Sequence, residues 1–227
     1  MILWERPGYV VGFTTRAGGV SEGAYESLNL AVSTGDDPER VERNRMLACG
    51  RLGLDAEALA FNRQVHSPTV HRARRGRRGD PGDGLWSDEP GLPMLAFAAD
   101  CLPIALARRS GTRALAVLHA GWRGLAEGVV AAGARAVGGD LAAIVGPAIG
   151  PCCYEVGPEV SALFDEDLTV DGKLDLWRAA ERALRAAGVS SVERVDLCTR
   201  CNPELFFSHR RTGPVRGVQG VIGAVAG

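Results

Sequence analysis

Two histidines and one cysteine have the residue types of a metal site, although they lie far apart along the chain. His66 and His119 each end a segment that has the pattern of a strand, and Cys101 lies in a turn between two more strands. Neutral imidazole and thiolate are good zinc ligands, and three protein ligands leave the fourth tetrahedral position open, as in catalytic sites. These residues therefore predict one open zinc site at the edge of a sheet.

The spacing of these residues is weak support by itself. The three positions are tens of residues apart and match no local zinc-finger pattern. Taken singly, a histidine at a strand end and an inert buried cysteine are common structural residues. The metal site therefore depends on the surrounding sequence.

Four further cysteines and a proline-rich loop are secondary candidates. Cys198 and Cys201 have the spacing of a redox motif or of half a zinc site, and with Cys152 and Cys153 could form a closed site of four thiolates. Such a site requires convergence in space that spacing does not predict, so it is disfavoured. In Gly146–Tyr154 the prolines remove N–H donors, which favours a rigid pocket wall over a phosphate-binding loop.

The elements that position these residues are short strands mixed with helices. Apolar runs bounded by Gly, Pro or charged residues predict strands at 9–15, 58–65, 94–98, 104–107, 114–119 and 142–145. Capping residues and helical spacing predict helices at 36–53, 126–137, 157–164 and 174–187. No strand-helix unit repeats, so we expect an α+β fold, a single layered domain over residues 1–227 with mixed β-sheets flanked by helices.

Composition limits the classes of partner. The 227 residues are 46% hydrophobic, and 26 basic against 27 acidic residues give a formal charge of -1. No large electrostatic field attracts nucleic acid or a membrane, so neither is an expected partner. The basic stretch 71–78 lacks interleaved aromatics and runs into a glycine-rich turn, which favours a solvated loop.

Export and membrane signals are not apparent in the sequence. No charged segment precedes an apolar signal core, and no run reaches the roughly 20 apolar residues that span a bilayer. We therefore expect a cytoplasmic protein. Its six cysteines should then stay reduced, which favours metal binding or catalysis over disulfides.

Eight ordered blocks, spread over about 200 residues, match the motifs of one known family. They are Phe13–Arg16 with Gly18–Ser21; Ser27–Leu30; Gly35–Pro38 with Val41, Asn44 and Arg45; Gln64–His66; Ala99–Pro103; His119–Gly124; Gly146–Gly150 through Tyr154–Gly157; and Cys198–Thr199 with Phe206–Ser208 and Arg210–Arg211. On these blocks the chain resembles the YfiH/YlmD laccase-domain family, formerly described as polyphenol oxidases.

The resemblance implies a zinc enzyme that acts on purine nucleosides and phosphate. The family activities are phosphorolysis of adenosine, inosine, guanosine or methylthioadenosine, and deamination of adenosine. His66, Cys101 and His119 fall on the metal ligands and catalytic residues of the family. The resemblance also implies a substrate-binding pocket near Arg16, Asn29, Arg45 and Gln64.

For these four residues, structural roles remain alternatives. Arg16 and Arg45 could form surface ion pairs instead of phosphate contacts. Asn29 and Gln64 could satisfy backbone groups near a turn or a strand end. The oligomeric state is open between a monomer and a small homo-oligomer.

Three competing functions can be stated. A copper-dependent polyphenol oxidase would need several more histidines than the four of this chain for a three-copper cluster, although copper could occupy the His/Cys site in vitro. A metal-free hydrolase could use Cys101 as nucleophile and His119 as base. A purely structural zinc is disfavoured, because such sites normally have four protein ligands.

Overall fold

Two six-stranded sheets form the centre of the molecule in this computed structural model, which describes residues 1–227. The first sheet has the order β1 (Ile2–Leu3), β2 (Tyr9–Phe13), β14 (Gln219–Val225), β7 (Met94–Ala98), β3 (Ala60–Arg63) and β5 (Arg78–Pro81). The second has the order β13 (Ser191–Arg194), β10 (Leu141–Val145), β8 (Leu102–Arg108), β9 (Leu115–Ala120), β6 (Gly84–Ser87) and β4 (Val70–Arg72). Both sheets contain parallel and antiparallel pairs.

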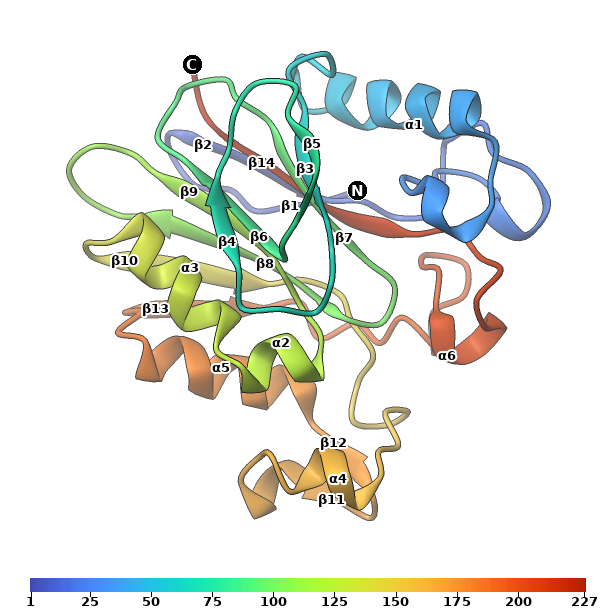
Figure 1. Cartoon of the computed structure of the whole chain (residues 1–227), viewed down its shortest axis with the longest axis vertical. Helices are drawn as coiled ribbons and strands as arrows, with labels where there is room; N and C mark the ends of the chain where they lie inside the picture. Colours follow the sequence, from blue (N-terminus) through green and yellow to red (C-terminus); the bar gives the residue numbers. More distant parts are fainter.

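Helices cover the outer faces of both sheets (Figure 1). The first sheet is covered by α1 (Pro38–Gly50), and the second by α3 (Val129–Val137) and α5 (Leu176–Ala186). Shorter helices are α2 (Trp122–Ala126), α4 (Pro158–Ser161) and α6 (His209–Thr212), and a small hairpin pairs β11 (Thr169–Val170) with β12 (Lys173–Leu174). The predicted α+β class with mixed sheets and flanking helices is confirmed. None of the helices is long and apolar enough to cross a membrane.

The central strands of the second sheet are buried on both faces, which explains their nearly continuous apolar sequences. Along β8, Ala105 and Ala107 face the first sheet, whereas Ile104 and Leu106 belong to the core under the helices. The same alternation continues in β9 and β10. On β8 the inner face carries only alanines, and the larger Leu115 and Val117 of β9 and Ile144 of β10 fill the core between the two sheets.

Several predicted bounds agree with the structure. Strand β7 has the predicted bounds 94–98, and β9 is shifted by one residue at each end. The helix predicted at 36–53 is α1, where the Asp37 side chain accepts a hydrogen bond from the backbone N–H of Glu39 and Pro38 occupies the first turn.

Other predictions about elements were wrong. The helix expected at 126–137 begins only at Val129, as α3, because Gly128 adopts a left-handed backbone with φ of 92°. The short helix α2 that precedes this break was not predicted. The helix expected at 157–164 ends at Ser161. The basic stretch expected to be a loop contributes to β4 and β5.

Four of the five arginines of that basic stretch are paired with carboxylates. Arg72 contacts Asp88, Arg75 contacts Glu89 at 2.6 Å, Arg77 contacts Asp80 at 2.7 Å, and Arg78 contacts Glu42 at 3.0 Å. Local ion pairs of this kind hold the strands and turns around them, so most of the positive charge of this stretch is matched within the protein.

The break at Gly128 leads to a stability prediction. Gly128→Ala should lower the free energy of unfolding by about 1–2 kcal/mol, because an L side chain is disfavoured in the left-handed region. Gly50→Ala is the matched control, since Gly50 lies at the end of α1, where an added Cβ would meet no heavy atom within 4 Å and should not destabilise the chain. Urea unfolding measures both, and equal stability of the two variants would contradict the role given to Gly128.

Candidate metal centre

The structure brings His66, Cys101 and His119 together from both sheets. His66 lies beyond the end of β3, Cys101 in the turn where the chain passes from β7 to β8, and His119 near the end of β9. The three donor atoms lie within 4.8 Å of one another, and Cys101 Sγ is 4.0 Å from His66 Nε2. The strand pattern predicted a site at the edge of one sheet. The structure instead places the three residues where the two sheets meet.

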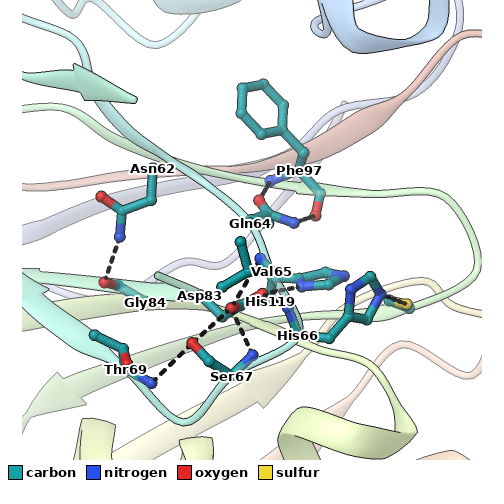
Figure 2. A network of polar contacts seen from close by, with 11 residues as sticks. Asn62, Gln64, Val65, His66, Ser67, Thr69, Asp83, Gly84, Phe97 and His119 are labelled. Carbon is teal, nitrogen blue, oxygen red and sulfur yellow. Dashed lines mark hydrogen bonds and ion pairs between the residues drawn. The ribbon is translucent and has the colours of Figure 1, made fainter. Parts of the chain in front are cut away.

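The carboxylate of Asp83 organises this site (Figure 2). It is 1% exposed and accepts hydrogen bonds from the backbone N–H groups of Val65, His66 and Ser67 and from the Ser67 hydroxyl. It also contacts His119 Nδ1 at 2.8 Å. Because Nδ1 is directed at Asp83, Nε2 of His119 is the nitrogen left for a metal.

The hydrogen bond between His119 and Asp83 is typical of a metal-binding histidine. A histidine that ligates a metal normally donates its other ring N–H to a carboxylate or a carbonyl, which fixes the tautomer and the orientation of the ring. Asp83 also holds the left-handed backbone of His66, which has φ of 60°, because it accepts a hydrogen bond from the backbone N–H of this residue. Two imidazoles and one thiolate, oriented before binding, suit Zn²⁺ with one position open.

Charges within the site favour the ligand form of Cys101. Burial raises the pKa of its thiol, but the neighbouring His119 and His66 outweigh burial and bring the pKa to about 6. Burial lowers the pKa of His119, but Cys101 and Asp83 outweigh it and raise the pKa to about 9. Burial likewise raises the pKa of Asp83, whereas His119 and the backbone donors lower it to about 2. Without a metal, these pKa values place a charged imidazolium of His119 between a thiolate and a carboxylate at neutral pH, and a metal at Nε2 would displace the proton of that nitrogen.

A second buried carboxylate positions the turn of Cys101. Asp100 has φ of 85° and is 6% exposed. Its side chain accepts hydrogen bonds from the Thr199 hydroxyl at 2.6 Å and from the backbone N–H of Arg210 at 2.7 Å, and its backbone carbonyl accepts from the N–H of Ile149. Three segments distant in sequence therefore converge on the residue that precedes the cysteine.

The donors open into a cavity of about 730 Å³. His66, Cys101 and His119 contribute to its lining, together with Arg45 and Gln64 from the predicted substrate-binding set. Four aromatic residues also line the cavity, namely Phe61, Phe97, Trp122 and Tyr154. The volume is within the range of about 300–1,000 Å³ that is usual for small-molecule sites.

Arg45 and Gln64 are held rigidly at this wall. Gln64 makes paired hydrogen bonds with the backbone of Phe97, of 2.6 and 2.9 Å. Arg45 is 6% exposed, donates to the carbonyl of Leu30 and to Glu42, and stacks over Phe61 with its guanidinium carbon 4.4 Å from the ring centroid. Burial lowers the pKa of Arg45.

The structure does not bring Arg16 and Asn29 to the cavity wall. The Arg16 guanidinium donates to the backbone carbonyls of Glu26 and Pro203. Asn29 is fully buried, bonds the backbone of Ala31 in both directions, and accepts from the N–H of Val218. Residues 31–34 line the cavity, so Asn29 supports the cavity rim indirectly, through its hydrogen bonds to the backbone of Ala31.

Three functional candidates, Asp83, Asp100 and Arg216, become visible only in the structure. Arg216 lines the cavity, and its buried Nε has no hydrogen-bond partner in the protein. Burial lowers the pKa of Arg216. Asp100 stands next to Cys101 in a block that matches the family, and this position could have identified it from the sequence. Asp83 lies in a segment predicted to be a turn, where nothing in the sequence indicates a role.

The layered α+β sandwich and its open His/Cys/His group define a protein with a candidate metal centre between two sheets. The chain belongs to the family described as multi-copper polyphenol oxidoreductase laccase, whose family model matches residues 10–225. Purine nucleoside phosphorylase PA4543 of Pseudomonas aeruginosa is 40% identical over 230 residues, covering 92% of this chain and 91% of the relative. Purine nucleoside phosphorylase YfiH of Escherichia coli is 36% identical over 232 residues, covering 92% and 91%.

Solved structures support the same assignment. YlmD from Geobacillus stearothermophilus matches with a TM-score of 0.89 at 33% identity, covering 97% of this chain and 93% of that one. The Neisseria meningitidis protein NMB0706 matches with a TM-score of 0.88 at 36% identity, covering 98% and 96%. The resemblance to YfiH and YlmD is confirmed.

Asp83 allows a test of the metal centre. Asp83→Asn should weaken zinc binding at the His66 group about 10- to 100-fold, because the amide is a poorer acceptor for His119 and turns a donor towards the backbone N–H groups. Titration of the metal-free protein with zinc measures the change. Asp140→Asn, an exposed carboxylate paired with Arg109, is the control. Unchanged affinity in Asp83→Asn would contradict the proposed link between Asp83 and the metal.

Proposed function

We propose that the chain is a zinc-dependent enzyme that cleaves adenosine, inosine, guanosine or methylthioadenosine by phosphorolysis and deaminates adenosine. The relatives named purine nucleoside phosphorylase support this class of substrate. The observation that carries the proposal is the open His66, Cys101 and His119 group in the wall of a cavity of about 730 Å³ lined by aromatic and arginine side chains. In this proposal the enzyme acts on free nucleosides and phosphate in the cytoplasm.

Residues of this chain supply the orientation that the reactions need. Zinc, when bound, would supply Lewis acidity and a nucleophilic water for deamination. Asp83 holds the His119 ring and, through three backbone N–H groups, the segment that carries His66. Asp100 holds the turn of Cys101. The donors are therefore in position before any substrate enters.

The aromatic lining suits a purine base. Phe61 and Phe97 pack edge to face, with ring centroids 5.3 Å apart, and Trp122 and Tyr154 contribute two further flat surfaces. Stacking on aromatic side chains accepts any purine, because every base has a π-face. This tolerance agrees with the range of nucleosides proposed.

Arginines at the cavity suit the attacking phosphate. The unpartnered Nε of Arg216 is a buried donor, and leaving such a group unsatisfied costs about 1–3 kcal/mol, so a phosphate oxygen there would satisfy it. Arg45 and Arg210 also line the cavity. Guanidinium groups hold phosphate through paired N–H donors, which favours arginine for this role.

A metal-free thiol hydrolase is the second candidate, favoured by one observation. Asp83, His119 and Cys101 form a chain of contacts, and the Cys101 pKa of about 6 describes a thiolate beside a charged imidazole. Such a pair is an activated nucleophile. The two candidates differ in their response to chelation, because a thiol hydrolase keeps its activity without metal.

The activity assay decides between them. Zinc-loaded protein is incubated with adenosine, inosine and methylthioadenosine, with and without phosphate, and free base and ammonia are followed. We expect phosphate-dependent release of base and its loss in His119→Ala or after removal of zinc, with the chain still folded. Full turnover after chelation would overturn the role of zinc, and it would favour the thiol hydrolase if that turnover does not require phosphate. The absence of any activity on nucleosides would overturn both assigned reactions.

Arg216 provides a test of the phosphate position. Arg216→Ala should reduce kcat/KM for phosphorolysis by roughly 10- to 150-fold, or about 1.5–3 kcal/mol, because a charge-assisted hydrogen bond is lost. Deamination, which uses no phosphate, should suffer less. If Arg45 also contacts the phosphate, Arg45→Ala should likewise lower kcat/KM for phosphorolysis more than for deamination.

The control for this prediction is Arg135→Ala, an exposed position on α3 that should leave both reactions unchanged. Arg216→Lys separates charge from geometry, since lysine keeps the charge and loses the planar fork. An equal fall of both reactions in Arg216→Ala would assign the residue to the nucleoside or to the fold instead of phosphate.

A further inference from the structure

Four cysteines from two distant loops meet at a second location. Cys152 and Cys153 lie in the turn after β10, and Cys198 and Cys201 lie in the turn after β13. Their four sulfur atoms all lie within 4.8 Å of one another. Cys201 Sγ is 3.6 Å from Cys152 Sγ and 3.3 Å from Cys153 Sγ. The convergence that the sequence could not predict is present.

Backbone contacts hold the two turns in this arrangement. Ala148 and Cys198 form a β-bridge, and the N–H of Thr199 donates to the carbonyl of Ala148 at 3.0 Å. The side chain and backbone N–H of Asn202 both donate to the carbonyl of Cys198. The cysteines are therefore brought together by the fold, not by contacts among the sulfur atoms alone.

A backbone donor is also directed at one of the sulfurs. The N–H of Gly150 donates to Cys198 Sγ at 3.3 Å. Hydrogen bonds of this kind orient ligands and stabilise thiolate around metal sites. The guanidinium of Arg211 donates to the carbonyls of Thr199 and Arg200 in the same turn, which places a positive charge beside the cysteines.

The distances suit one tetrahedral ion better than a disulfide. Zinc–sulfur bonds of about 2.3 Å in a tetrahedron place the sulfurs about 3.8 Å apart, close to the separations observed here. A disulfide would join one pair at about 2.05 Å and would leave two thiols over. Cys201 lies at similar distances from Cys152 and Cys153, so no pair is singled out. All four donors are soft sulfur atoms, which excludes magnesium and calcium.

We propose that Cys152, Cys153, Cys198 and Cys201 bind one Zn²⁺ in a closed site of four thiolates, separate from the His66 group. Four protein ligands leave no open position, so this ion is structural. The proposal does not depend on the nucleoside activity. It gives the chain two zinc sites of different kinds.

Such an ion would stabilise the part of the cavity wall that is formed by the two loops carrying the cysteines. The loop of Cys152 and Cys153 carries Ile149 and Tyr154, which line the cavity, and the turn of Cys198 leads to His209 and Arg210, which also line it. Thr199, between the proposed ligands, donates to Asp100 beside Cys101. The closed site thus stabilises the segments that hold the turn of the open one.

Metal content of the full chain tests the proposal. Wild-type protein purified with zinc should contain two ions per chain, and Cys101→Ala, which loses a ligand of the open site, should keep one. Cys198→Ser combined with Cys201→Ser in the Cys101→Ala background should remove that ion. Cys49→Ala is the matched control, because Cys49 lies on the buried face of α1, belongs to neither donor group, and should not change the count.

Two further measurements keep the test independent of folding. Cys152 is exposed, so Cys152→Ser should fold and should bind the second ion more weakly than its parent. X-ray absorption at the zinc edge of Cys101→Ala should show sulfur alone as the neighbour, at about 2.3 Å. Cobalt in the same variant should give intense sulfur-to-metal charge-transfer absorption.

Three results would overturn the proposal. They are a zinc-free Cys101→Ala protein purified in the presence of zinc, an ion that survives replacement of Cys198 and Cys201 in the Cys101→Ala background, and a mass two hydrogens lower with no metal, which would identify a disulfide. Iron in place of zinc, revealed by colour and elemental analysis, would overturn the choice of metal.

Discussion

The buried carboxylate of Asp83 is the interaction on which the candidate metal centre depends. A carboxylate that is 1% exposed would be very costly without partners, and here hydrogen bonds from the backbone, from Ser67 and from His119 offset its loss of water. The same bonds fix the left-handed backbone of His66 and the ring of His119. One desolvated charge therefore determines the orientation of two of the three donors.

Asp100 has the corresponding role for the third donor. Its contacts with Thr199, Arg210 and Ile149 join the turn of Cys101 to loops that the helices on the second sheet support. The proposed site of four cysteines lies in these same loops. The candidate active site is accordingly positioned from one side by Asp83, in the bend between β5 and β6, and from the other by loops for which the proposed second ion would supply the rigidity that short turns lack.

Much of the fold was predictable from apolar runs, since β7 and β9 are buried strands bounded by Gly, Pro or polar residues. Strands β4, β5 and β6 were missed, because they are only three or four residues long and their pairing depends on distant partners. The Gly-Asp-Pro of β5 is in addition typical of turns. The break at Gly128 was missed because a single glycine within an apolar helical pattern does not reveal its φ. The expectation of one domain over residues 1–227 stays a prediction.

The candidate site was predictable to a smaller extent. His66, Cys101 and His119 were found by residue type and by the family resemblance, whereas no local pattern separates Asp83 from the other aspartates of a glycine-rich segment. The meeting of four cysteines depends on the pairing of β10 with β13, which is a long-range property. Arg16 and Asn29 illustrate the opposite case, in which residues from matched blocks lie behind the cavity and support its rim.

In the open site, His66 follows strand β3 of the first sheet and His119 lies on strand β9 of the second. Cys101 lies in the turn between β7 and β8, through which the chain passes from the first sheet to the second. The distances among the donors therefore depend on how the two sheets are registered against each other. An ion that bound only this register would stabilise the sandwich by mass action, by an amount that grows with the logarithm of the ratio of its free concentration to its dissociation constant. In the proposed enzyme, the availability of metal would thereby be coupled to the free energy of unfolding of the chain as well as to its chemistry.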